Sequence, residues 1–274
     1  MKKIHLLIYI TLLFSEDRLI SIGGCVTETI FELDLGYKVV AVDQSSTFPE
    51  EIKKLPQVGY IRSISSEGIL SMYPDHILTT TDIGPPNVIQ QIEMSGVKID
   101  IFDSPHSVED IIKLVENISV SIKASNKGMN LVDTIKFYDN KIKDERSSLK
   151  HKPKIAFFMN PSSGSYNASG NQTRANYLIE YIGGVNVFSD KFDKYKKVSK
   201  EEIIYSNPDI ILVASIFESN KGDALLTFID NDEFKSVNAV QNLKVFNVSL
   251  GKYLTFGPNF VKDALFLMKS LNIK

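Results

Sequence analysis

The chain has 274 residues, with 31 Lys and Arg residues against 33 Asp and Glu residues, so its formal net charge is −2. This balance excludes a large basic surface, and nucleic acid is therefore not expected as a partner. Hydrophobic residues make up 43% of the chain and charged residues 23%, which is typical of a globular protein rather than a disordered chain or a membrane bundle. The single cysteine, Cys25, excludes an internal disulfide and a multi-cysteine metal site.

The N-terminus has the pattern of a signal peptide. Two lysines precede an apolar run over 4–14, and Ser15 follows as a small residue suited to cleavage. The run is shorter than the roughly 20 residues that a membrane-spanning helix needs. We therefore expect residues 1–15 to direct export and the mature chain to begin near Glu16. The alternative is an amphipathic or buried first strand.

An internal repeat organises the rest of the chain. A shift of 134 residues, from Ser65 to Ser199, aligns a Ser-x-Glu-x-Ile motif and then a Pro-Asp-x-Ile-Leu motif that begins at Pro74 and Pro208. In each copy the serine can cap a short helix, the helix must end before the proline, and a β-branched strand follows. The two copies predict two related lobes.

Strands and helices alternate through both copies. Such alternation predicts parallel sheets covered by helices, so the expected fold class is α/β with two Rossmann-like lobes. We expect an N-terminal lobe over 16–106 and a C-terminal lobe over 148–274. The expected strands lie at 18–22, 38–42, 76–80 and 97–102, and then at 154–159, 185–188, 209–214 and 244–248.

The segment between the lobes has helical spacing. A start resembling a capping box at Ser107 and Asp110 precedes apolar residues that recur three and four positions apart. We therefore predict one long linker helix over 107–147, with Gly128 as a candidate kink. The alternative is two ordinary helices broken at 126–128. A continuous helix is expected to resist hinge rotation between the lobes.

Several short motifs connect the chain to a known family. From about Arg18 to its C-terminus the chain resembles the haem-binding periplasmic proteins of bacterial ABC haem importers. The wider cobalamin and ferric-siderophore binding group shares the lobes and the linker, whereas the Gly-Tyr-x-Arg and Ser-x-Glu-Gly segment is specific to the haem subgroup. The motifs are Arg18-Leu19-Ile20-Ser21-Ile22-Gly23-Gly24, Val26-Thr27-Glu28, Val58-Gly59-Tyr60-Ile61-Arg62, Ser65-x-Glu67-Gly68, Gly84-Pro85-Pro86 and Phe256-Gly257-Pro258.

The resemblance carries expectations about fold, ligand and partners. It implies the architecture of a class III periplasmic binding protein, in which the linker joins the two lobes. It further implies haem as the transported ligand and the permease and ATPase complex of an ABC importer at the inner membrane as the partner. A periplasmic, monomeric protein is the expected form.

Tyr60 and Arg62 are the central candidate residues. Ferric iron favours an anionic oxygen donor, and tyrosine phenolate is a known axial ligand of haem iron. Free tyrosine has a pKa near 10, so the phenolate needs stabilisation from the metal and from a guanidinium such as that of Arg62. Residues i and i+2 of an extended loop can point to the same side. The resemblance implies that Tyr60 binds the iron and that Arg62 supports it; the alternative is an exposed loop tyrosine with a local hydrogen bond.

The resemblance also implies further residues around the cleft. The loop over 160–170 matches a second-lobe cleft loop in which some family members carry a histidine ligand that this chain lacks. Tyr166 and Asn167 are therefore candidate haem contacts, with packing as the alternative role for Tyr166. Thr81 and Asp82 are expected at the rim of the first lobe. On the second lobe the expected contacts are Lys252, Tyr253 and Asn259.

Glu67 and Glu201 occupy equivalent positions of the repeat, each near an expected helix start. The resemblance implies that both glutamates dock the transporter through arginines on its permease. The alternative is that each carboxylate only stabilises its own helix N-terminus.

Two other classes of function are weighed against haem binding. Binding of cobalamin or a ferric siderophore would use the same fold with a different cleft. An enzyme is not expected, because the sequence has no Gly-x-Ser-x-Gly motif, no Walker-type loop and no complete dinucleotide fingerprint.

Overall fold

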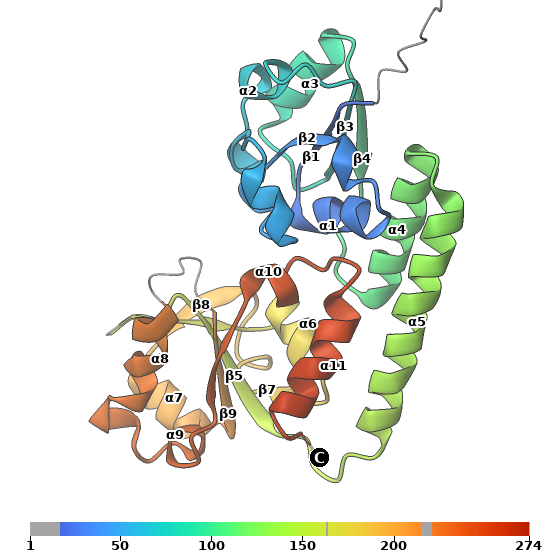
Figure 1. Cartoon of the computed structure of the whole chain (residues 1–274). Coiled ribbons are helices and arrows are strands. Elements are labelled where there is room, and N and C mark those ends of the chain that lie inside the picture. Colours follow the sequence, from blue (N-terminus) through green and yellow to red (C-terminus); the bar gives the residue numbers. More distant parts are fainter. Residues whose placement is uncertain (1–16, 163, 215–220, 274) are drawn as a thin grey trace, which may run out of the picture.

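Residues 17–162, 164–214 and 221–273 are described by the structure, a computed structural model, and they form two α/β lobes (Figure 1). The expected signal peptide, residues 1–15, lies outside the described residues. Within these three ranges, no helix combines the length and the apolar character that crossing a membrane requires.

The N-terminal lobe is a parallel four-stranded sheet in the order β2-β1-β3-β4. Successive side chains of a strand point to opposite faces. Ile20 and Ile77 therefore pack with side chains of α2 and α3, whereas Leu19 and Leu78 pack with side chains of α1 and α4. The elements are β1 (Leu19–Ser21), α1 (Gly24–Glu32), β2 (Val39–Val42), α2 (Ser66–Leu70), β3 (His76–Thr80), α3 (Pro86–Met94) and β4 (Lys98–Phe102), with 3-10 helices at Gly36–Lys38, Glu50–Lys54 and Ile61–Ser63.

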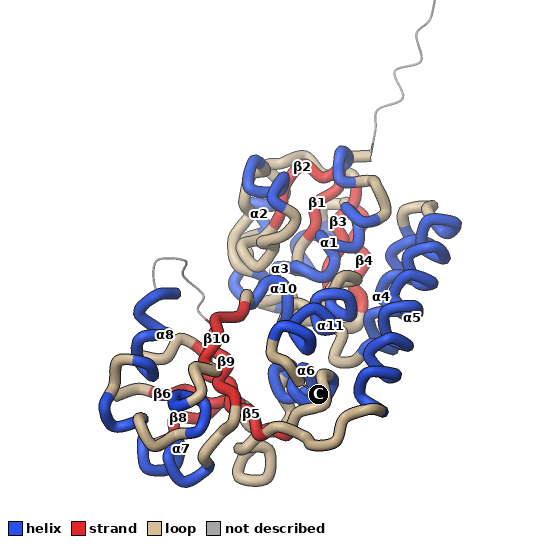
Figure 2. Tube along the Cα trace, turned by 60° about the horizontal axis from the view of Figure 1, so that its bottom comes forward, coloured by secondary structure: helices blue, strands red, loops and turns tan. Residues whose placement is uncertain are grey.

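The expected single linker helix over 107–147 is wrong. The segment forms two helices, α4 (Val108–Ser121) and α5 (Ser125–Ser147), which lie side by side (Figure 2). The chain reverses at 122–124, where Lys123 has a φ of 57°. Both halves carry an apolar stripe, and folding back allows residues from both stripes to share one core cluster.

Gly128 does not kink the linker. It lies within α5, where its missing side chain leaves room for Ser119 of α4. A glycine that the sequence marks as a weak point of a helix thus serves the close approach of two helices. The longer of the two helices is α5, which has 23 residues and a length of about 34 Å.

The C-terminal lobe has a six-stranded sheet in the order β10-β9-β5-β6-β8, with β7 paired to β5. The sheet is mixed rather than parallel, because β6 runs antiparallel to both β5 and β8. The elements are β5 (Lys154–Met159), β6 (Tyr166–Ser169), α6 (Arg174–Tyr181), β7 (Val185–Asn186), β8 (Tyr195–Val198), α7 (Lys200–Ser206), β9 (Ile210–Ala214), α8 (Lys221–Ile229), a 3-10 helix at Asp232–Phe234, α9 (Asn238–Gln241), β10 (Val245–Val248), α10 (Leu250–Tyr253) and α11 (Phe260–Ser270).

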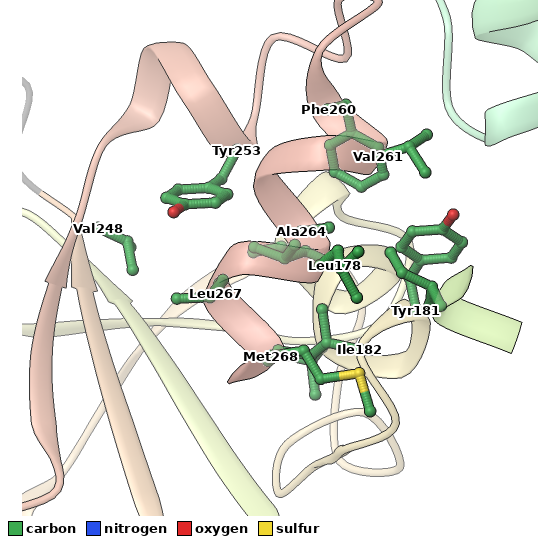
Figure 3. Close-up of a cluster of buried hydrophobic side chains, with 14 of the residues drawn as sticks. Leu178, Tyr181, Ile182, Val248, Tyr253, Phe260, Val261, Ala264, Leu267 and Met268 are labelled. Atoms are coloured by element: carbon green, nitrogen blue, oxygen red, sulfur yellow. The ribbon is translucent and has the colours of Figure 1, made fainter. Parts of the chain in front are cut away.

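Two hydrophobic layers cover the faces of this sheet. One face packs against α6 and α11, which also meet α5; Figure 3 shows Leu178, Tyr181, Phe260 and Met268 within this cluster. The other face is aromatic, with Phe158, Phe228 and Phe234 in contact. Each lobe therefore has its own buried core, which fixes the loops at the ends of its strands.

The sequence repeat is a structural repeat. Asp75 accepts a hydrogen bond at 2.8 Å from the backbone N–H of Arg18, just before β1, and Asp209 accepts one at 2.9 Å from the backbone N–H of Lys154, the first residue of β5. In return each aspartate's backbone N–H donates to the carbonyl of the same partner, at 2.9 and 2.8 Å. The same reciprocal pair of hydrogen bonds, called here the aspartate clamp, therefore ties the residue before β3 to the start of β1 and the residue before β9 to the start of β5.

Candidate functional site

A cavity of about 530 Å³ lies between the two lobes. Its volume is within the range of small-molecule pockets, about 300–1,000 Å³. The lining comes from loops at the carboxyl ends of strands: Gly23 follows β1, Gln44 follows β2, Thr80 ends β3, Met159 ends β5 and Leu250 follows β10. Ligands of parallel α/β sheets bind at this end of the strands, so the cavity is the candidate site.

Tyr60 reaches the cavity from a loop beside β2. The residue before it, Gly59, has a φ of 110°, a conformation that side-chain-bearing residues rarely adopt. The carbonyl of Gly59 accepts a hydrogen bond at 2.8 Å from the N–H of Gln44, and the carbonyl of Tyr60 accepts one at 2.8 Å from Ser63. The backbone on both sides is therefore fixed, while the Tyr60 side chain lines the cavity and remains 45% exposed.

The expected extended geometry around Arg62 is wrong. Residues Ile61–Ser63 form a 3-10 helix in which Ile61 is buried. The guanidinium of Arg62 pairs with Asp82, with 3.5 Å between Nη2 and Oδ1. Tyr60, Arg62 and Asp82 all line the cavity, but the sequence did not predict the pairing of Arg62 with Asp82.

Asp82 also pairs with a residue that the sequence did not single out. Arg174 Nη2 lies 3.6 Å from Asp82 Oδ2, which links the second lobe to the first. Arg174 begins α6, whose N-cap Thr173 accepts a hydrogen bond at 2.9 Å from Asn176. A cation in the first turn of a helix opposes the helix dipole. That mismatch is the sequence signal that could have found Arg174.

Other predicted contacts lie away from the cavity. Tyr166 is only 4% exposed, and its ring packs at 5.7 Å from that of Phe228 and 5.4 Å from that of Phe234. The expectation that Tyr166 contacts the ligand is therefore corrected to its alternative, a packing residue. Asn167 pairs with β8 opposite Lys197. Neither residue is among those that line the cavity.

The expected rim contacts of both lobes are also wrong in part. Thr81 is exposed and donates a hydrogen bond at 3.3 Å to Ser104, while Thr80 lines the cavity in its place. Tyr253 is buried in the C-terminal core, and the neighbouring Leu250 and Leu254 supply the apolar wall. Lys252 is exposed and is not among the lining residues.

Asn259 joins the lobes instead of lining the cavity. Its backbone N–H donates to Glu28 Oε1 at 2.7 Å, and its side-chain amide donates to Glu32 Oε1 at 2.7 Å. Burial raises the pKa of Glu28 to about 7. Gly257 lies so close to this carboxylate that a side chain would collide with it. The Val-Thr-Glu and Phe-Gly-Pro motifs therefore form an interlobe contact.

Cys25 also lines the cavity, but its chemistry differs from that of Tyr60. Burial raises the pKa of its thiol to about 12, although the positive charge of Arg174 opposes this shift. Cys25 is buried, whereas Tyr60 is about half exposed. Tyr60 is the more accessible of the two candidate ligands.

Glu67 and Glu201 lie at matching places in the two lobes. Each is the second residue of a short helix, α2 and α7 respectively, whose N-cap serine accepts a backbone hydrogen bond. Both are exposed, and neither lines the cavity. Their placement matches the expected equivalence of the repeat.

The fold and the cavity define a two-lobed protein that binds a small molecule between its lobes. The chain belongs to the periplasmic binding protein family, whose model matches residues 19–249. This is a family of binding proteins and not a class of enzymes. The expected class III architecture is confirmed, with the linker and the second sheet corrected as described.

Solved structures and curated sequences are similar to the chain in different ways. The periplasmic heme-binding protein RhuT from Roseiflexus sp. RS-1 superposes with a TM-score of 0.86 at 26% identity, covering 93% of this chain and 98% of that one. The periplasmic heme-binding protein HutB of Vibrio cholerae gives 0.83 at 25% identity, covering 94% and 100%. The vitamin B12-binding protein of Vibrio vulnificus (strain YJ016) is 28% identical over 206 residues, which are 75% of this chain and 74% of that protein.

Proposed function

We propose that this protein binds haem in the cavity between its lobes and delivers it to an ABC importer. The observation that carries the proposal is the position of Tyr60, whose accessible phenol lines a cavity of about 530 Å³ at the interface of the lobes. The likeness to heme-binding proteins over more than nine-tenths of the chain supports it. Ile61, Met159 and Leu254 add apolar surface suited to a porphyrin.

In this proposal Tyr60 is the axial ligand of the haem iron. A phenolate oxygen matches the preference of ferric iron for an anionic donor, and coordination to the iron supplies most of the stabilisation that the phenolate needs. Arg62 lies in the same cavity wall and adds a positive charge. Reduction to ferrous iron would weaken this bond and offers one route to release.

We infer that Glu67 and Glu201 dock the permease, so that the transporter recognises both the charge and the spacing of the two lobes. Exposed carboxylates on equivalent helices are suited to pair with arginines on a partner.

We further propose that residues 1–15 direct export, that the mature chain begins near Glu16, and that the protein acts as a monomer. N-terminal sequencing of the secreted protein tests the cleavage site.

Charge reversal at both glutamates separates docking from binding. The double variant Glu67→Arg, Glu201→Arg should abolish haem uptake by cells and leave haemin affinity unchanged. A matched control reverses two other exposed glutamates, Glu93 on α3 and Glu116 on α4, and should transport normally. Normal uptake by the Glu67 and Glu201 variant would rule out the docking role.

Vitamin B12 is the second candidate ligand, because the curated relatives are vitamin B12-binding proteins. Titration with haemin and, separately, with cyanocobalamin distinguishes the two ligands. We expect a shifted haem spectrum with haemin and no binding of cyanocobalamin. Cyanocobalamin binding without haemin binding would favour the second candidate.

A further inference from the structure

Three charged side chains meet at the cavity, and their charges do not cancel. The carboxylate of Asp82 lies between two guanidinium groups, with its Oδ1 3.5 Å from Arg62 Nη2 and its Oδ2 3.6 Å from Arg174 Nη2. One carboxylate thus faces two guanidinium cations, so the three side chains together carry a net positive charge. Both distances are longer than the roughly 2.7–2.9 Å of a tight charge-assisted hydrogen bond. The pairing is therefore loose enough for another anion to compete.

Arg174 is held in place more firmly than Arg62. Its Nη1 donates to the carbonyl of Leu254 at 3.2 Å, and its guanidinium lies 5.5 Å from the ring centre of Phe256. Its side chain is 25% exposed, against 67% for Arg62. A guanidinium that is already oriented and partly desolvated loses little freedom when it binds a carboxylate.

We propose that Arg174 binds a carboxylate of the ligand and that Asp82 takes the place of this carboxylate in the ligand-free protein. The inference rests on the proposed function and deepens it, because haem carries two propionate carboxylates whereas the corrin ring of cobalamin carries amides. Arg174 thereby becomes a residue that selects a carboxylate-bearing ligand. Asp82 keeps the guanidinium of Arg174 paired until the ligand arrives, so that this partly buried cation is not left without a carboxylate partner.

Esterified haemin tests this role, because haemin dimethyl ester keeps the iron and the ring but has no free carboxylate. We expect the wild-type protein to bind haemin at least about tenfold more tightly than the ester. Arg174→Gln should weaken haemin binding by a similar factor and leave ester binding unchanged. Asp82→Asn removes the competing carboxylate and should strengthen haemin binding about fivefold, without changing ester binding. Arg146→Gln, which removes an exposed arginine of α5, is the matched control and should bind both ligands like the wild type.

The outcomes that would overturn the inference differ from those that would overturn the proposed function. Equal binding of haemin and ester by the wild-type protein, which needs no variant to fold, would contradict a carboxylate site. Equal weakening of both ligands by Arg174→Gln would show that the arginine only maintains the fold. If the wild-type protein bound neither porphyrin, the proposed function would fail and the inference with it.

Discussion

The two lobes contain the same folding unit but present different chemistry to the cavity. In each lobe a serine caps a short helix and an aspartate clamps the first strand of the sheet. The two lobes then differ in what they present to the cavity: Tyr60 of the first lobe lines it from a loop, whereas Tyr166 of the second begins β6 and is buried among phenylalanines. The second lobe contributes Arg174 and apolar side chains instead. The repeat thus determines the fold, and the loops determine the site.

The contrast between the two tyrosines gives the largest expected effect. Tyr166→Ala removes a buried ring from an aromatic cluster and should lower the free energy of unfolding by about 3–5 kcal/mol. Tyr60→Ala alters a half-exposed side chain and should lower it by less than about 0.5 kcal/mol. Urea denaturation of both variants measures the difference. Equal losses would mean that the two tyrosines have similar surroundings.

The interlobe contact at Glu28 gives a smaller, pH-dependent effect. Burial raises the pKa of Glu28 from 4.5 to about 7, with contributions from the negative charges of Asp263 and Glu32. Between these two values the folded protein binds more protons at this site than the unfolded chain, so this residue's contribution to stability falls as pH rises. Glu28→Gln removes the ionisation but keeps an oxygen for the N–H of Asn259. The variant should gain stability relative to the wild type from pH 4.5 to 8, measured by thermal unfolding; a constant difference would contradict the raised pKa.

The aspartate clamps give a matched comparison between the lobes. Asp75→Ala and Asp209→Ala each remove one hydrogen bond to the backbone at the start of a central strand. Each substitution should cost about 0.5–1.5 kcal/mol. Similar losses in chemical denaturation would support the structural repeat, whereas a negligible loss in one lobe would limit the clamp to the other.

Movement between the lobes is the smallest expected change. The continuous helix α5 and the Glu28–Asn259 contact both resist a hinge rotation. Solution scattering should therefore give nearly equal radii of gyration for the ligand-free and haemin-loaded protein. A marked contraction on loading would point instead to a hinge at the turn over 122–124.

Much of the fold could be predicted from local sequence. The strand at 76–80 coincides with β3 and that at 154–159 with β5, because runs of apolar and β-branched residues end at recognisable turns. Strand β8 was missed, since Tyr195-Lys196-Lys197-Val198 places two exposed lysines at its centre. The turn between α4 and α5 was misplaced because the apolar spacing on its two sides is compatible with one helix or two. Only tertiary packing distinguishes these cases.

The site was predictable where a motif supplied it and not where distant residues meet. The segment around Gly59 and Tyr60 was singled out by its resemblance to a family motif, Gly-Tyr-x-Arg. The position of Arg174 in the first turn of α6 can mark this residue, but no local pattern indicates its pairing with Asp82 in the other lobe. Tyr166 was assigned to the cavity but lies in the core. The local sequence around a tyrosine does not indicate whether its ring faces a core or a cavity.

The most direct test of haem binding is the visible spectrum of haemin with Tyr60→Phe. This variant keeps the ring and removes the proposed donor oxygen, and Tyr73→Phe, at another exposed tyrosine, is the matched control. We expect the wild type and Tyr73→Phe to give the same ferric phenolate spectrum. Tyr60→Phe should lose that spectrum and bind haemin at least about tenfold more weakly. An unchanged spectrum and affinity in Tyr60→Phe would contradict the assignment of Tyr60 as the iron ligand.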